Sequence, residues 1–318
     1  DGGLDPAHKT LAAAFAEAGY ETWHTGKWHV NGQPRDQGYA RMRRHFSSGG
    51  SRGQPLPEKD ERGLPLTGYR GWTFKHEDGK VEAERGIGLT ARTSEHIADG
   101  AIEVIRGLRD TGKPLFLHVN FTAPHDPRLW PAGYAPGPAD KRPPLPPNFA
   151  REHPFDHGNA GGRDETLIPV PLDPEQVRDE LEVYHALVRD LDTQTGRILA
   201  ALEAAGIRQD TVIVFTSDQG LAMGCNGLMG KQNQYEHSIR SPLVLAGPGV
   251  PAGVQSAALC YLRDLYPTLC ELCAVPVPAS VQARSLLPLL RGEAEALHEV
   301  VVGTFTDTQR MLCDTRWK

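Results

Sequence analysis

Residues 211–242 read TVIVFTSDQGLAMGCNGLMGKQNQYEHSIRSP. The apolar segment 211–215 predicts a strand that leads directly into Asp218 and Gln219, and a glycine-rich segment then leads to Lys231. In open α/β sheets, ligands bind just beyond the carboxyl ends of the strands. Carboxylate and amide oxygens suit a hard cation, and the lysine suits an anion bound to that cation. The stretch therefore predicts a metal-assisted site for a phosphate or sulfate group, with a solvated strand and loop as the alternative.

Composition limits the classes of function. The chain has 318 residues, 39% of them hydrophobic and 23% charged, which is typical of a globular protein. The net charge of −6 argues against a nucleic-acid binder that uses a basic surface. No apolar run reaches the ~20 residues that a membrane span needs. We therefore expect neither nucleic acid nor a membrane as a partner.

The five cysteines do not form a recognisable framework. Their number is odd and they are widely spaced, so they predict no disulfide network. Cys270 and Cys273 form a C-x-x-C pattern inside an apolar helical segment. Because the second cysteine pair of a zinc site is missing, we interpret them as buried thiols.

The order of predicted elements indicates the fold class. Helices are predicted at 8–18, 93–110, 173–206 and 263–274, and strands at 20–25, 115–121, 211–215, 243–246, 299–305 and 309–317. Residues 31–90 have weak periodicity and are interpreted as loops and short strands over a surface. Residues 124–171 hold 12 of the 26 prolines, which argues against regular structure there. A loop of that length in a compact domain is usually functional or disordered.

Helix–strand alternation through residue 246 predicts an α/β fold with a doubly wound, mainly parallel sheet and helices on both faces. The last two strands are close in sequence, as in an antiparallel hairpin. They predict the start of a small C-terminal antiparallel subdomain. We accordingly place a catalytic α/β domain at 1–298 and the beginning of the subdomain at 299–318.

Polar residues follow three of the predicted strands. Lys27 and His29 follow the first, His125 follows the strand at 115–121, and Asp218 with Gln219 follows the strand at 211–215. Strand ends in a doubly wound sheet can meet at one edge. We therefore expect these clusters, together with Lys231, to converge. Taken alone, each cluster can also be interpreted as ordinary structural or surface residues without a functional role.

Several ordered segments resemble the sulfatases of the alkaline phosphatase superfamily. They are TLAAAFAEAGYETWHTGKWH at 10–29, PLFLHVNFTAPHDP at 114–127, VRDLDTQTGRILAALEAAGIRQDTVIVFTSDQG at 188–220, GLMGKQNQYEHSIRSPLVLAGPG at 227–249 and DLYPTLCELCAVPVP at 264–278. The pattern GYxTxxxGKWH in the first segment is especially diagnostic. The resemblance implies an alkaline phosphatase-like fold over nearly the whole chain.

The resemblance also implies roles for individual residues. Asp218 is similar to a metal-ligand aspartate, and Gln219, which is usually Asn in the family, would offer its side-chain carbonyl to Ca²⁺, with Mg²⁺ as the alternative. Lys231 is similar to the lysine that holds the sulfate oxygens.

The remaining carried-over residues lie in the N-terminal half. Lys27 and His29 resemble the pair that contacts the nucleophile and the sulfate. His125 is similar to the histidine that protonates the leaving alcohol. Cationic groups around the equatorial oxygens would then provide most of the stabilisation of the transition state.

One feature departs from the family. Sulfatases carry Cys or Ser in a C/S-x-P/A-x-R motif that is oxidised to the formylglycine nucleophile, and no Cys or Ser of residues 1–318 begins this motif. An acidic metal-ligand pair is also missing. We expect a fragment that lacks the N-terminal nucleophile motif, with a degenerate homologue as the alternative. We also expect that residues 1–318 alone neither hydrolyse sulfate esters nor bind calcium tightly.

The expected function is metal-dependent hydrolysis of a sulfate monoester. A phosphodiesterase or phosphonate hydrolase of the same superfamily and a non-catalytic glycan-binding homologue remain alternatives. The ligand would be a sulfated small molecule or a sulfated glycan, and the resemblance implies a periplasmic, secreted or lysosome-like location. Loop residues that can line an outer pocket are Arg52, Arg70, Trp130, Arg142 and His237, and His237 is the expected substrate contact.

Overall fold

The computed structural model describes residues 5, 7–50, 58–60, 62–66, 68–108, 112–138 and 141–318. The chain divides into two compact units, each considered by itself below. Unit 1 comprises Asp1–Pro144 and Pro174–Arg208, and unit 2 comprises Leu145–Asp173 and Gln209–Lys318. The expected boundary at residue 298 stays a prediction. Among the described residues, no helix is both long enough and apolar enough to cross a membrane.

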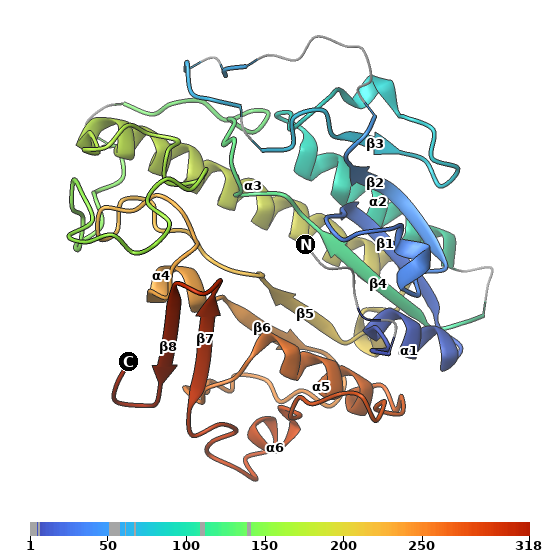
Figure 1. Ribbon diagram of the computed structural model, residues 1–318. Helices are drawn as coiled ribbons and strands as arrows, with labels where there is room; N and C mark the ends of the chain where they lie inside the picture. Colours follow the sequence, from blue (N-terminus) through green and yellow to red (C-terminus); the bar gives the residue numbers. More distant parts are fainter. Residues whose placement is uncertain are drawn as a thin grey trace. The chain divides into compact units, whose positions relative to one another are not determined.

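Unit 1 is built on a four-stranded sheet with the order β3-β2-β1-β4 (Figure 1). The strands are β1 (Glu21–Lys27), β2 (Arg41–Ser47), β3 (Thr73–Lys75) and β4 (Leu115–Asn120). β1 runs parallel to both β2 and β4, and β3 pairs antiparallel with β2. The prediction of a mainly parallel sheet in an α/β fold is confirmed.

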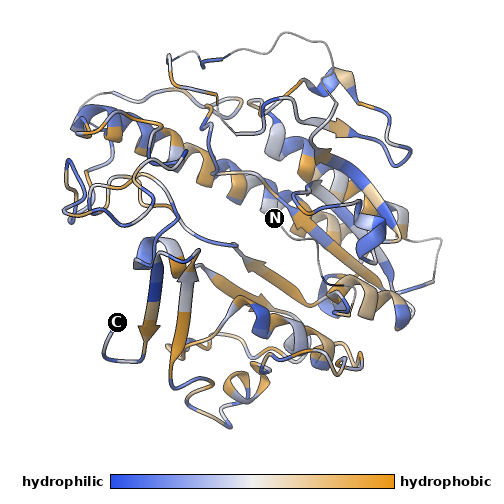
Figure 2. Ribbon diagram, in the orientation of Figure 1, coloured by the Kyte–Doolittle hydropathy of each residue, from blue (hydrophilic) through white to orange (hydrophobic). Residues whose placement is uncertain are grey.

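Helices cover both faces of this sheet. Unit 1 holds α1 (Leu11–Glu17), α2 (Thr93–Gly107) and α3 (Pro174–Ala205). Side chains alternate between the two faces along a strand. On one face of β1, Thr25 donates a hydrogen bond to the α2 carbonyl of Ile97 at 3.4 Å. On the other face, Ala12 of α1 packs with Trp28 and Tyr39. Figure 2 shows alternating hydrophilic and hydrophobic bands along α3, as the amphipathic pattern predicts.

The interpretation of residues 31–90 as surface segments was wrong for β2 and β3. Phe46 of β2 and Phe74 of β3 are 0% and 1% exposed and pack with Tyr69 and Ile97 in the core. The segment RMRRHFS is hard to recognise as a core strand from sequence. Its three arginines interrupt the alternation of apolar and polar residues that a half-buried strand usually shows.

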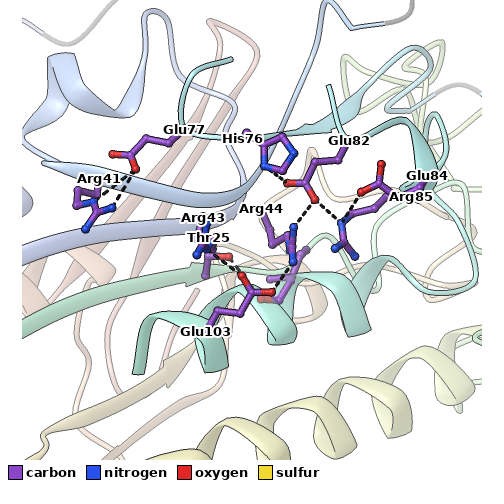
Figure 3. A network of polar contacts seen from close by, with 11 residues as sticks. Thr25, Arg41, Arg43, Arg44, His76, Glu77, Glu82, Glu84, Arg85 and Glu103 are labelled. Carbon is purple, nitrogen blue, oxygen red and sulfur yellow. Dashed lines mark hydrogen bonds and ion pairs between the residues drawn. The ribbon is translucent and has the colours of Figure 1, made fainter. Parts of the chain in front are cut away.

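A β-bulge explains how a charged residue enters this strand. The β1–β2 register shifts between Thr25 and Gly26, which lie opposite Arg43 and His45, so Arg44 is the extra residue. Arg44 has φ +50°. Its guanidinium pairs with Glu82 and Glu103, and Arg85 also pairs with Glu82 (Figure 3). The Glu82 side chain is 0% exposed, and a carboxylate buried to this degree requires such partners.

Gly100 of α2 leaves the space that the Arg44 side chain occupies. A Cβ at Gly100 would lie 2.6 Å from Cγ of Arg44 and 2.5 Å from Oγ1 of Thr25. The helix therefore approaches the sheet closely at the bulge only because no side chain stands at this position.

Unit 2 contains two antiparallel strand pairs, β5 (Ile213–Thr216) with β6 (Leu243–Ala246) and β7 (Val301–Phe305) with β8 (Gln309–Cys313). The predicted C-terminal antiparallel pair is confirmed. We expected the parallel sheet to continue through residue 246, but β5 and β6 pair antiparallel. Their connection contains only α4 (Glu236–Ile239), which is too short for the crossover helix that parallel pairing usually needs.

The other helices of unit 2 lie in its C-terminal half, where α5 spans Leu265–Leu272 and α6 spans Leu287–Leu290. Short 3₁₀ helices complete the described part of the chain at Pro34–Gln37, Ala83–Arg85, Arg208–Asp210 and Leu262–Asp264. The side chain of Cys270 in α5 is buried, as predicted, and burial raises its pKa to about 11. Cys273 is partly buried, and neither cysteine forms a disulfide.

We predict that Gly100→Ala lowers the free energy of unfolding of unit 1 by about 1–3 kcal/mol, because the added methyl group overpacks the bulge. Gly196→Ala in α3 is the matched control, since a Cβ there meets nothing within 4 Å. It should raise stability by ~0.5–1 kcal/mol through the helix preference of alanine. Urea denaturation followed by circular dichroism measures both changes. Equal effects of the two substitutions would contradict the packing argument.

Candidate functional site

The carboxyl end of β1 is fixed by a close approach to β4. Gly26 has φ +90°, and a Cβ there would lie 2.1 Å from the carbonyl oxygen of Asn120. Only glycine meets both conditions. The carbonyl of the next residue, Lys27, accepts hydrogen bonds from Nδ2 of Asn120 at 3.3 Å and from Nε2 of His24 at 3.2 Å. The backbone of Lys27 is therefore held from two strands.

The turn Tyr69–Trp72 brings the three predicted residues of unit 1 together. The ammonium of Lys27 lies 5.3 Å from the centre of the Tyr69 ring, and the His125 ring meets the same ring edge-on at 4.9 Å. Trp72 packs on Tyr69 at 5.0 Å and on His29 at 5.4 Å. The structure thus places Lys27 and His125 against one aromatic ring and His29 against its neighbour.

The sequence reasoning missed both aromatic residues. Tyr69 is 7% exposed and has φ +58°, an uncommon conformation for a bulky residue that is often found at functional sites. The neighbouring Gly68 lies so close to the next loop that a Cβ would stand 2.6 Å from the carbonyl oxygen of Asp126. Aromatic residues that directly follow glycines, as in GYRGW at 68–72, were the available signal.

The ring of His125 is oriented by the next residue. Its Nδ1 lies 2.7 Å from the carbonyl oxygen and 3.0 Å from Oδ1 of Asp126, whose side chain is 2% exposed. A hydrogen bond on one ring nitrogen fixes the imidazole and sets the role of the other. A cavity of about 20 Å³ lies beside His125, which is room for about one water molecule.

A buried ion network anchors this loop to α3. Glu180 accepts a hydrogen bond from Nε of Arg128 at 2.6 Å and from Nη1 of Arg62 at 2.5 Å. Arg62 also donates to the carbonyl oxygen of Arg128 at 2.6 Å. Because Glu180 is 3% exposed, loss of either arginine would leave a buried charge poorly compensated.

Beneath Lys27, histidines gather in the sheet. His24 and His45 are 0% and 2% exposed, and their rings are 5.9 Å apart. Burial lowers the pKa of His24 well below its usual value, with the neighbouring histidines adding to the effect. Burial, with Lys75 nearby, lowers the pKa of His45 to about 4. Both rings are therefore neutral near pH 7.

In unit 2, Asp218 and Gln219 lie on the loop that follows β5, as predicted. Both side chains are exposed. Oδ1 of Asp218 accepts a hydrogen bond from the Gln219 amide at 3.0 Å. Gly220 then packs so closely on α4 that a Cβ would lie 1.9 Å from the carbonyl oxygen of His237. The short helix thus fixes the loop that carries the two predicted metal ligands.

Their oxygens suit a hard cation in kind, but two side chains are too few for the six to eight oxygens that Ca²⁺ binds. Within the residues that the structure describes, no group of three or more His, Cys, Asp or Glu side chains could hold a metal ion. Asp218 and Gln219 can therefore supply part of a metal site.

Lys231 is paired with a carboxylate that the sequence reasoning missed. Its ammonium lies 2.9 Å from Oδ2 of Asp164, and the two side chains are 10% and 2% exposed. Nε of Arg163 also donates to Asp164 at 2.8 Å. The acidic pair Asp164–Glu165 stood in the proline-rich stretch, where no periodic pattern marked it as buried.

His237, the expected substrate contact, lies in the first turn of α4 and is partly buried. Its ring packs against Tyr235 at 5.5 Å. Burial, with Lys318 nearby, lowers its pKa to about 4.

The other expected pocket residues are dispersed. Arg52 lies outside the described residues, Arg70 is exposed, and Trp130 is partly exposed. Arg142 forms ion pairs with Asp179 of α3 at 2.8 Å and with Glu175 at 3.3 Å. The expected convergence of the unit 1 and unit 2 residues on one sheet edge stays a prediction.

Comparison with known proteins places this site in context. Residues 2–275 match the family named Sulfatase. The chain is 33% identical over 138 residues to arylsulfatase K of Xenopus laevis, which covers 43% of this chain and 25% of that protein. It is 25% identical over 319 residues to an arylsulfatase of Clostridium perfringens, which covers 92% of this chain and 64% of that protein. The chain thus spans less than two thirds of either relative.

Solved structures share the fold. One is a protein in complex with its substrate, D-glucosamine-2-N,6-O-disulfate, with a TM-score of 0.67, 21% identity, and coverage of 98% of this chain and 72% of that chain. Another is a phosphonate monoester hydrolase from Silicibacter pomeroyi, with a TM-score of 0.66, 23% identity, and coverage of 92% and 63%. The alkaline phosphatase-like fold is thereby confirmed.

We predict that unit 1 loses stability as the pH falls from about 6.5 towards 4. In that range the unfolded chain binds a proton at His45 that the folded chain does not bind, so protonation favours unfolding. Between pH 7 and 4.5, His45 alone should cost about 2–3 kcal/mol. Denaturant midpoints measured across this range test the effect.

His45→Phe should flatten this pH dependence, because neither ring nitrogen of His45 has a hydrogen-bond partner among the described residues. Met42→Leu in the same strand is the control and should leave the slope as it is. A wild-type slope in His45→Phe would refute the assignment.

Proposed function

We propose, from the premise that this chain belongs to the sulfatase family, that it carries the cationic and proton-donating parts of a site that hydrolyses a sulfate monoester. The observation that supports this most directly is the placement of Lys27 and His125 against the same Tyr69 ring. A cation for the sulfate oxygens and a histidine for the leaving oxygen must lie near each other, and Tyr69 keeps them near.

Lys27, His29 and Lys231 would stabilise the negative charge on the equatorial oxygens of the transferring group. Such preorganised electrostatic stabilisation is usually the largest single contribution to catalysis. Lys231 can do this while it remains paired with Asp164, because an ammonium has three N–H donors. Asp164 would then fix the direction in which the other donors point.

His125 would donate a proton to the oxygen of the leaving alcohol. Asp126 holds Nδ1 of the ring, so the proton transfer would use Nε2. A positioned histidine typically contributes ~10²–10⁴-fold to such a step. The need for this proton grows with the basicity of the leaving alkoxide.

We further propose a formylglycine nucleophile and a Ca²⁺ or Mg²⁺ ion as parts of the complete site. Asp218 and Gln219 would hold the metal in part, and the metal would supply Lewis-acid stabilisation of the sulfate oxygens. The nucleophile motif and the acidic pair would lie outside residues 1–318.

A phosphonate monoester or phosphodiester hydrolase is the second candidate, and a phosphonate monoester hydrolase of the same fold supports it. A glycan-binding homologue without catalysis is the third. Parallel assays of a complete protein with p-nitrophenyl sulfate and p-nitrophenyl phenylphosphonate separate them. Faster turnover of the phosphonate would overturn the sulfatase proposal, and turnover of neither would favour a binding function.

We predict that His125→Gln in a complete protein lowers kcat by ~10²–10⁴-fold for an alkyl sulfate, because the basic alkoxide leaves poorly without a proton. The same substitution should change kcat for p-nitrophenyl sulfate by less than about tenfold, because p-nitrophenolate leaves unaided. His185→Gln, at an exposed position of α3, is the control. Equal losses with both substrates would contradict the assignment of His125 as the acid.

We also predict that Tyr69→Leu lowers kcat by about 3–30-fold, because it removes the ring that holds the Lys27 ammonium, a contact worth ~0.5–2 kcal/mol. Tyr69→Phe keeps the ring and should retain most of the activity. Steady-state kinetics of both variants check this. An equal loss in Tyr69→Phe would show that the hydroxyl group, and not the ring, carries the effect.

A further inference from the structure

The carbonyl group of Lys27 lies where the backbone pairing of two strands stops. Within the described sheet, the pairing of β1 with β4 ends at Gly26 and Asn120. Two side chains continue the hydrogen bonding one residue further. Nδ2 of Asn120 lies 3.3 Å from the Lys27 carbonyl oxygen, and Nε2 of His24 lies 3.2 Å from it. The backbone of Lys27 is therefore held by side-chain donors at the end of its strand.

The geometry of these three groups indicates which ring nitrogen of His24 carries the proton. Nε2 of His24 also lies 3.2 Å from Nδ2 of Asn120. If Nε2 were bare, its lone pair would face the lone pairs of the Lys27 oxygen. A protonated Nδ1 would then be a buried donor without a partner among the described residues, which is rare in native proteins. The proton is therefore on Nε2, and the Lys27 oxygen, which has two lone pairs, accepts from both side chains.

The His24 ring is held in place by two aromatic side chains. It is 0% exposed and lies edge-on to the rings of Trp28 at 5.1 Å and Tyr39 at 5.5 Å. Trp28 is fixed in turn, because its Nε1 donates to the carbonyl oxygen of Gly32 at 2.9 Å. The Tyr39 hydroxyl oxygen lies 2.7 Å from Nδ1 of His118. A donor whose ring is locked by such packing holds its acceptor precisely.

His24 supplies this hydrogen bond without adding a charge. Burial lowers its pKa well below the usual value, and His118 and His45 add to the effect. The ring is therefore neutral near pH 7. A neutral donor fixes the backbone of Lys27 and leaves the electrostatics of the strand end to the Lys27 ammonium group.

The place of the carbonyl group matters because the same residue carries the ammonium group. The Lys27 side chain is a flexible four-carbon stem, and its ammonium group lies over the Tyr69 ring at 5.3 Å from the centre. A shift of the Lys27 backbone would move the start of this stem and hence the ammonium group relative to Tyr69. In catalysis, a displacement of ~1 Å can cost ~10²-fold in rate.

We propose that His24 is a positioning residue for Lys27, whose Nε2–H group fixes the Lys27 carbonyl group and so holds the ammonium group over Tyr69. His24 acts through Lys27 and does not itself contact the substrate. The catalytic part of this inference rests on the proposed function of Lys27, whereas the positioning part rests on the contacts of His24 alone.

The first test measures the position of the Lys27 ammonium group in the 318-residue chain without any turnover. Reductive methylation with ¹³C-formaldehyde labels the lysine amines and keeps their charge. The NMR signal of Lys27, identified by its loss in Lys27→Arg, should be shifted upfield by the Tyr69 ring. Tyr69→Leu should remove this shift, and His24→Leu should remove most of it. An unchanged Lys27 signal in His24→Leu would overturn the proposal.

His24→Leu is expected to fold, because Asn120 still donates to the Lys27 carbonyl oxygen. Circular dichroism checks this for each variant. His24→Asn is a second variant without the donor, because the amide of asparagine takes the place of Nδ1 and does not reach that of Nε2. It should lose the upfield shift as well, and a wild-type shift in a folded His24→Asn would contradict the role of Nε2.

Two matched variants separate the hydrogen bond from general packing. His24→Gln keeps an N–H donor near the place of Nε2 and should retain the upfield shift. His45→Leu makes the same change as His24→Leu in a neighbouring buried histidine, whose nitrogens have no hydrogen-bond partner among the described residues. It should also retain the shift. Loss of the shift in either variant would show that packing in the sheet places Lys27, and would overturn the proposal.

The second test measures turnover of p-nitrophenyl sulfate by a complete protein. His24→Leu should lower kcat about 3–10-fold with little change in KM, because one hydrogen bond is worth roughly that factor and Lys27 would act on the transition state. His24→Gln and His45→Leu should keep kcat within about twofold of the wild-type value. Equal losses in His24→Leu and His45→Leu would overturn the positioning role.

Lys27→Met in the complete protein separates the two proposals. If it keeps the full kcat while the upfield shift depends on His24, the proposed function of Lys27 fails and the positioning role of His24 stands. If it abolishes turnover while His24→Leu keeps both the shift and kcat, the positioning role fails and the proposed function of Lys27 stands.

Discussion

The contact of Gly26 with the carbonyl oxygen of Asn120 is the constraint on which the N-terminal part of the site depends. At 2.1 Å from a Cβ position, it excludes every residue with a side chain. The strands β1 and β4 therefore approach each other closely at their carboxyl ends. Because of this approach, the Lys27 carbonyl lies within reach of His24 and Asn120, and the Lys27 side chain leaves the sheet over Tyr69. A backbone requirement thus determines where a charge is placed.

Much of the fold was predictable because its signals are local and periodic. The apolar spacing in α2 and α3 and the apolar runs of β4 and β5 gave elements of the correct type close to their observed bounds. The core position of β2 was missed because its arginines are satisfied by partners distant in sequence, such as Glu82 and Glu103 for Arg44. Pairings of that kind depend on tertiary contacts that no window of sequence contains.

The candidate site was predictable to a different degree. Lys27, His125 and Lys231 were identified as candidates because they follow predicted strands and lie in short sequence motifs. Tyr69 and Asp164, which contact them, lie 42 residues or more from the cations they hold and stand in segments without periodicity. The sequence therefore indicates candidate groups for the chemistry more readily than the groups that hold them in place.

The Lys231–Asp164 pair has a consequence for selectivity. Since both side chains are almost fully buried, their attraction is poorly screened by salt. An anion would therefore have to use the N–H donors of Lys231 that Asp164 leaves open. Such a lysine selects among anions by their fit at short range, because a bound anion must share the ammonium group with Asp164.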